Sequence, residues 1–164
     1  MTHENKFGMF IHWGVYALTG VHEQVFAKLD IPREEYEELY KRFHPVDYDP
    51  EKWVLLAKEA GMKYICFTAK HHDGFCLWPS KYTEHCTKNS PYKNGEGDIV
   101  REFTDACREY GLKVGIYVSP WDRNAPFWGS KEYTNYYVNQ LTEILTEYGN
   151  IDEIWWDGAG SSNA

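Results

Sequence analysis

Four short apolar segments alternate with longer amphipathic ones along the chain. The apolar segments cover residues 7–12, 64–69, 114–118 and 151–156, and each is a continuous run rather than an alternation of apolar and polar positions. Continuous runs of this length are typical of strands that are covered on both faces, as in a parallel sheet. We therefore predict four buried parallel β-strands.

Helices are predicted between the strands from their periodicity and their end signals. Pro32 begins an acidic helix whose apolar stripe reaches Phe43, and Pro50 begins a second helix. Asp98 is a suitable N-cap for a third, which Gly111 ends, and a fourth covers residues 131–148. Residues 78–97 are predicted to form a long loop, and loops of that length are functional or disordered.

The order β, α, α, β, α, β, α, β indicates an α/β protein in which right-handed crossovers join parallel strands. Four strands are half of a (β/α)8 TIM barrel, and 164 residues suit one domain. We therefore predict a single half-barrel domain over residues 1–164. Such a half-barrel leaves strand edges unpaired and an apolar face exposed, so we expect a homo-oligomer that covers them.

Charge and composition narrow the classes of partner. The formal net charge is −8, and the chain lacks the clustered lysine and arginine that nucleic-acid binding requires. The sequence contains no apolar run long enough to cross a bilayer, and none resembling a signal peptide precedes the first strand, so we expect a cytoplasmic protein without a membrane partner. The four cysteines form no CxxC pair, which gives no zinc pattern.

Polar and aromatic residues follow the same end of all four predicted strands. His12 ends the first strand, His71 and His72 follow the second, Tyr117 is near the end of the third, and Asp157 follows the fourth. The active site of an α/β barrel lies at the carboxyl ends of its strands, so these residues are expected to converge on one cleft. Seven Trp, thirteen Tyr and eight Phe suit either a ring-rich core or a site where rings stack on sugars.

Asp157 and the histidine pair each allow two interpretations. Asp157 is either a carboxylate for glycosyl transfer or the cap of a tight Asp157-Gly158 turn. His71 and His72 are adjacent, so in an extended strand they would point to opposite faces, which argues against a shared metal. Both reach the cleft only if the alternation breaks at the strand end. His12 and Tyr117 are either site residues or buried structural ones.

Several separated motifs together resemble glycoside hydrolase family 29, the α-L-fucosidases. They are KFGMFIHWG at 6–14, AGMKY at 60–64, FTAKHHDGFCLW at 67–78, GLKVGIY at 111–117 and EIWWDG at 153–158. The stretch SPWDRN at 119–124 resembles the subgroup that acts on branched α1,3/4-linked fucose.

The resemblance implies a role for each candidate residue. Asp157 is the expected nucleophile, forming a covalent fucosyl-enzyme with retention of configuration. Three histidines are expected to hold the fucose hydroxyls, and two aromatic residues to line the site: His12, His71, His72, Tyr117 and Trp155. The family's general acid/base lies beyond the nucleophile, outside this chain. Glu23 is the best substitute within it, although Gln24 replaces the family's Trp, and Asp73 and Asp122 are weaker candidates.

Three functions remain open on these grounds. The first is a retaining exo-α-L-fucosidase that needs no metal or organic cofactor and acts on fucosylated oligosaccharides or glycoconjugates. The second is a catalytically impaired fucose-binding fragment that lacks the general acid/base. The third is a metal-dependent hydrolase that uses His12, His71, His72 and Asp157 as ligands.

Overall fold

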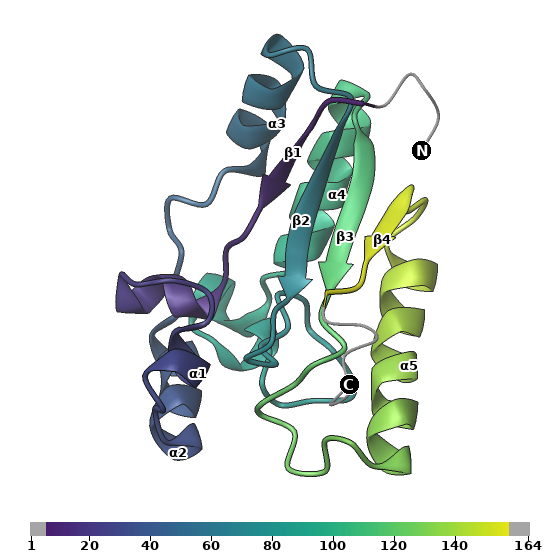
Figure 1. Cartoon of the computed structure of the whole chain (residues 1–164). Helices are drawn as coiled ribbons and strands as arrows, with labels where there is room; N and C mark the ends of the chain where they lie inside the picture. Colours follow the sequence, from purple (N-terminus) through teal and green to yellow (C-terminus); the bar gives the residue numbers. More distant parts are fainter. Residues whose placement is uncertain (1–5, 158–164) are drawn as a thin grey trace.

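A computed structural model describes residues 6–157 and shows one parallel sheet of four strands (Figure 1). The strands are β1 (Gly8–Ile11), β2 (Tyr64–Lys70), β3 (Lys113–Val118) and β4 (Glu153–Trp155). They lie in the order β1-β2-β3-β4, and each neighbouring pair is parallel. The predicted fold class is confirmed: four parallel strands with flanking helices form part of a (β/α) barrel.

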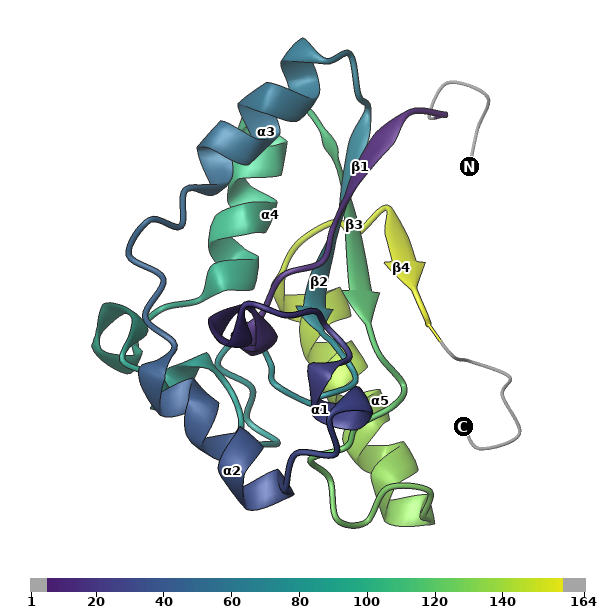
Figure 2. The same cartoon turned by 60° about the vertical axis from the view of Figure 1, so that its left-hand side comes forward.

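Within residues 6–157, five α-helices connect or flank these strands. They are α1 (Val25–Lys28), α2 (Arg33–Glu37), α3 (Pro50–Glu59), α4 (Ile99–Tyr110) and α5 (Lys131–Glu147). Short 3-10 helices are η1 (Val15–Thr19), η2 (Glu38–Arg42), η3 (Thr87–Asn89) and η4 (Tyr92–Gly95). Helices α3 and α4 lie together on one side of the sheet (Figure 2).

The predicted ends of the third helix are confirmed. The Asp98 carboxylate accepts a hydrogen bond from the backbone N–H of Arg101, and Gly111 ends α4 in the left-handed conformation. Asp49, just before Pro50, caps α3 in the same way through the N–H of Lys52. Local end signals therefore determine where these helices begin and stop.

One prediction about the connecting segments is wrong. The single helix expected from Pro32 to Phe43 is divided into α2 and η2. Glu34 and Glu38 would stand one turn apart in a continuous α-helix, and like charges at that spacing destabilise it. The long loop predicted at 78–97 is present between β2 and α4; it contains η3 and η4 and buries Trp78.

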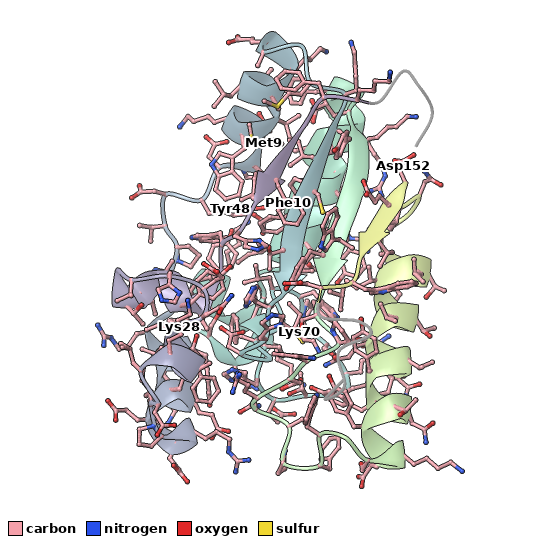
Figure 3. All side chains as sticks on the ribbon, viewed as in Figure 1. Met9, Phe10, Lys28, Tyr48, Lys70 and Asp152 are labelled. Atoms are coloured by element: carbon pink, nitrogen blue, oxygen red, sulfur yellow. The ribbon has the colours of Figure 1, made fainter. Side chains whose placement is uncertain are left out.

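The core lies between the sheet and the helices α3 and α4. Ile65, Phe67 and Ile116 from the strands are fully buried against Val54 of α3 and Phe103 of α4. The other face of the sheet carries exposed aromatic side chains: Phe10 is 43% exposed (Figure 3). No helix among residues 6–157 is long and apolar enough to cross a membrane.

Candidate active site

The histidine pair follows β2 in a tight turn rather than in the strand. The pairing of β2 with β3 shifts between Thr68 and Lys70, and the N–H of Gly74 donates to the carbonyl of His71 at 3.0 Å. The rings of His71 and His72 are therefore only 4.3 Å apart, centroid to centroid. Of the two arrangements left open by the sequence, the structure has the second: β2 ends at Lys70, the alternation breaks there, and the two rings do not point to opposite faces.

Asp157 lies beside this pair, as the strand-end pattern predicts. Its Oδ2 accepts a hydrogen bond of 3.0 Å from the hydroxyl group of Tyr117 and lies 3.5 Å from Nε2 of His72. Burial and the charge of Asp157 raise the pKa of Tyr117, which keeps the phenol a neutral donor. The Asp157 side chain is 47% exposed, so the carboxylate is open to a ligand. Gly158, the partner in the alternative turn, lies outside the described residues.

The tautomer of neutral His12 follows from its hydrogen bonds. The Thr68 hydroxyl donates its only hydrogen to the carbonyl of Ile11 at 2.9 Å. The 2.8 Å contact between His12 Nδ1 and Thr68 Oγ1 therefore requires Nδ1 to be the donor. Nε2 of neutral His12 is left as an acceptor.

The same argument assigns the tautomer of His72. The Ser119 hydroxyl donates to the carbonyl of Trp121 at 2.9 Å, so His72 Nδ1 donates to Ser119 Oγ at 2.6 Å. Nε2 of neutral His72 then faces the Asp157 carboxylate with a lone pair. Because neither of these two atoms, 3.5 Å apart, carries a hydrogen to donate to the other, a ligand hydroxyl can donate to either of them.

Burial keeps all three histidines neutral near pH 7. Desolvation lowers the pKa of His71 to about 3, with smaller contributions from His72 and His12. Desolvation also lowers the pKa of His12 and of His72, and nearby carboxylates oppose the change. The site therefore offers neutral imidazole acceptors beside a carboxylate, an arrangement that suits a ligand rich in hydroxyl groups.

A cavity of about 280 Å³ opens at Asp157. Residues from the four segments that follow the strands line it: Glu23, Gln24, Phe26, Ala27, His72, Asp73, Trp121, Arg123 and Asp157. Glu23 also lines an adjoining cavity with His12 and Tyr16, so it stands between the two. The structure thus brings Glu23, His12, His72 and Asp157 to one place, as predicted.

The other predicted residues lie behind or beside this cavity. His71 is 3% exposed, and its ring is stacked on Tyr117 with centroids 5.4 Å apart. Trp155 instead packs edge-on against Phe10 at 5.3 Å on the open face of the sheet, and it does not line either cavity.

The two weaker acid candidates have different environments. Asp73 is buried, accepts hydrogen bonds from the Tyr36 hydroxyl and the Phe75 N–H, and lines the cavity. Burial raises the pKa of Asp73 to about 6. Asp122 is paired with the buried ammonium group of Lys70 at 3.3 Å, which identifies it as a structural residue.

Several contact residues escape prediction from the sequence. Three of them follow β3 at the same end of the sheet as the other site residues: Ser119, Trp121 and Arg123. Their position after a strand end is the sequence feature that could have identified them. Thr68, which orients His12, lies inside β2 among apolar residues and gives no signal of its own.

Three side chains here have the geometry to hold a metal ion. One ligand atom from each of His71, His72 and Asp157 lies within 4.8 Å of the others, the one such group among residues 6–157. His71 Nδ1 is buried, and no atom of residues 6–157 forms a hydrogen bond with it. The sequence-based argument against a shared metal assumed that His71 and His72 lie in an extended strand. Because they lie in a turn instead, that argument does not hold.

The family model for α-L-fucosidase matches residues 2–164. Alpha-L-fucosidase 1 of Arabidopsis thaliana is 48% identical over 118 residues, which is 71% of this chain and 23% of the relative. Tissue alpha-L-fucosidase of Bos taurus is 31% identical over 94% of this chain and 38% of the relative. The chain therefore spans well under half the length of either.

Solved structures agree with these matches. A glycoside hydrolase 29 family member from an unknown rumen bacterium is 48% identical, with a TM-score of 0.84 over 95% of this chain and 26% of that one. A GH29 alpha-L-fucosidase from Bacteroides thetaiotaomicron, trapped as a covalent intermediate with 2-fluoro-fucosyl fluoride, is 36% identical, with a TM-score of 0.87 over 94% of this chain and 40% of that one. By sequence and by fold, the chain belongs to the α-L-fucosidase family.

Proposed function

We propose that the protein is a retaining exo-α-L-fucosidase that acts on terminal fucosyl groups of oligosaccharides or glycoconjugates. In the first step an Asp157 oxygen bonds to the anomeric carbon while the bond to the leaving-group oxygen breaks. That oxygen takes a proton from a carboxylic acid. The same carboxyl group, now deprotonated, takes a proton from water; the water oxygen then cleaves the covalent fucosyl-enzyme and restores the Asp157 carboxylate.

The observation that carries this proposal is the setting of Asp157. The carboxylate is half-exposed at the cavity, held by the Tyr117 hydroxyl at 3.0 Å, and flanked by the His72 acceptor at 3.5 Å. Neutral His12 and His72 are suited to accept hydrogen bonds from sugar hydroxyls. The trapped covalent intermediate of the Bacteroides thetaiotaomicron relative supports a covalent step in this family.

We propose Glu23 as the acid/base available within this chain. Glu23 and Asp157 line the same cavity, and the retaining mechanism needs two carboxyl groups roughly 5–5.5 Å apart. Asp73 also lines this cavity, but both of its carboxyl oxygens already accept hydrogen bonds, from the Tyr36 hydroxyl and the Phe75 N–H, so it is a poorer candidate for the acid/base. If Glu23 does not act as the acid, the second candidate function is a fucose-binding fragment without turnover.

The test is release of nitrophenol from p-nitrophenyl α-L-fucoside. Asp157→Ala should abolish release and still bind fucose, whereas the matched control Asp105→Ala, on the exposed side of α4, should retain activity. The sugar product should first appear as the α-anomer by NMR. Full activity of Asp157→Ala, or a β-anomer as first product, would refute the proposal. Fucose binding without release by the wild-type chain would favour the binding fragment.

A metal-dependent hydrolase is the second catalytic candidate, because His71, His72 and Asp157 can converge on one ion. Treatment with EDTA and dialysis distinguishes the two mechanisms. The carboxylate mechanism requires that activity survive this treatment. Loss of activity that zinc restores would instead support the metal mechanism.

We also propose that the chain forms a homo-oligomer. Among residues 6–157, β1 pairs only with β2 and β4 only with β3, so both sheet edges are open. Phe10 and Trp155 expose 43% and 44% of their surface on the open sheet face. A second copy would cover these surfaces. A monomer at micromolar concentration in sedimentation velocity would contradict the proposal.

A further inference from the structure

The Asp157 cavity carries more negative than positive side chains. Among the described residues that line it, three are carboxylates and one is a guanidinium: Glu23, Asp73, Asp157 and Arg123. A cleft with an excess of one charge raises the local concentration of ions of the opposite charge. A fucosyl group has no charge, so this excess also suits a second kind of ligand, a cation.

The histidine pair and Asp157 have the spacing of metal ligands. One ligand atom of each of His71, His72 and Asp157 lies within 4.8 Å of the other two. His72 Nε2 and Asp157 Oδ2 are 3.5 Å apart. Two ligand atoms that each lie about 2.0–2.2 Å from a tetrahedral zinc ion are about 3.4 Å from one another. The His72–Asp157 pair therefore already has the separation of two zinc ligands, with His71 close enough to be the third.

Neighbouring groups leave these ligands free to bind a metal. His72 Nδ1 donates to Ser119 Oγ at 2.6 Å, which leaves the lone pair of Nε2 facing Asp157. The Tyr117 hydroxyl takes one lone pair of Asp157 Oδ2 at 3.0 Å and leaves another. Outer hydrogen bonds of this kind orient metal ligands. His71 Nδ1 is buried without a hydrogen bond to residues 6–157, which points to a group that these residues do not supply.

We infer that this cluster is a zinc site, and that zinc and fucose exclude one another from it. Two imidazole nitrogens and one carboxylate suit zinc, whereas magnesium and calcium prefer oxygen ligands. The Asp157 side chain is 47% exposed, which leaves room for water as a fourth ligand.

The effect of zinc on activity rests on the proposed function. An Asp157 oxygen that is bound to zinc does not attack the anomeric carbon, and a zinc-bound His72 Nε2 does not accept a hydrogen bond from a sugar hydroxyl. Zinc is therefore a reversible inhibitor of this site rather than its cofactor. This role is the opposite of the one that a metal-dependent hydrolase would give it.

The test is isothermal titration of the EDTA-treated and dialysed full chain with zinc chloride at pH 7. With fucose present at about ten times its own Kd, the apparent Kd for zinc should rise about elevenfold, as mutual exclusion requires. In the p-nitrophenyl α-L-fucoside assay, zinc should raise KM and leave kcat unchanged.

Three variants locate the bound ion. His72→Ala should remove the zinc binding that fucose competes with. Ser119→Ala keeps all three ligands and removes only the hydrogen bond that orients His72, so it should weaken zinc binding by about tenfold to a hundredfold. The matched control is His44→Ala, which removes an exposed histidine outside the cavity and should leave the Kd for zinc unchanged.

Each part of the inference has its own refutation. Absence of zinc binding, or binding that persists in His72→Ala, would refute the site. Zinc binding that fucose does not weaken would refute mutual exclusion, and loss of activity after EDTA that zinc restores would make zinc a cofactor. If the chain binds zinc but no fucose, the proposed function is refuted, and loss of zinc binding in His72→Ala would still support the metal site.

Discussion

The hydroxyl group of Tyr117 donates a 3.0 Å hydrogen bond to Oδ2 of Asp157. The register of the sheet explains this contact, because Tyr117 of β3 pairs with Trp155 of β4, two residues before Asp157. The bond orients the carboxylate and leaves Oδ1 without a described protein donor among residues 6–157. The proposed nucleophile is thereby positioned by a neighbouring strand rather than by its own segment.

Replacing Tyr117 by Phe should lower kcat/KM for an aryl fucoside by roughly tenfold to a hundredfold, the size of a hydrogen bond to a charged group. The matched control is Tyr137→Phe, because that hydroxyl donates to the backbone carbonyl of Val118 and does not line the Asp157 cavity. Equal effects of the two substitutions would show that Tyr117 matters only for stability.

The histidine cluster should make the protein less stable as the pH falls. The pKa of His71 is lowered to about 3, so between pH 6.5 and 3 the unfolded chain binds a proton that the folded chain does not. The free energy of unfolding therefore decreases on acidification in this window. His71→Asn should flatten that dependence, as measured by urea unfolding at pH 7 and pH 4.5.

Two buried groups outside the histidine cluster contribute in the same range. His85, with its pKa lowered to about 4, acts with the same sign, while Asp73, with its pKa raised to about 6, acts with the opposite sign. Both remain in the His71→Asn protein, so the difference between wild type and variant isolates His71. An unchanged pH dependence would mean that His71 titrates alike in the folded and unfolded chains.

The buried ion pair of Lys70 and Asp122 should be important for stability. Lys70 Nζ also donates to Gln140 Oε1 at 2.8 Å, and its side chain has no exposed surface (Figure 3). Lys70→Met leaves the Asp122 carboxylate buried without its cation, which should cost about 3–5 kcal/mol in urea unfolding.

The double variant Lys70→Met with Asp122→Asn provides the control, because the Asn oxygen still accepts from the N–H groups of Asn124 and Ala125. It should be more stable than the Lys70→Met protein. A double variant that is less stable than the single one would contradict the ion-pair account.

Gly74 should tolerate a methyl group poorly. It has a φ of +79° in the turn after the histidine pair, and an added Cβ would overlap Oδ1 of Asp122. Gly111 has a similar φ of +75° but open space around it. Gly111→Ala should cost about 1 kcal/mol for the conformation alone. Gly74→Ala should cost more and weaken fucose binding, as measured by urea unfolding and titration; equal costs would exclude a steric effect.

The sequence by itself determined the order of strands and helices and the edge of the sheet where the polar residues gather. These features are local: apolar runs indicate buried strands, and Asp98 and Gly111 mark helix ends within a few residues of themselves. The strand-end position of Asp157 also followed, because parallel strands end at a common edge. The family motifs added the expected role of each residue.

Only the tertiary structure decided how those residues face one another. His71 and His72 share one side because Gly74 closes a turn after β2. Asp122, which is far from this turn in the sequence, lies against Gly74 and is paired with Lys70. The cavities form where the segments after β1 and β3 meet across the end of β2. Such contacts depend on long-range packing and buried charge, and no periodicity along the chain encodes them.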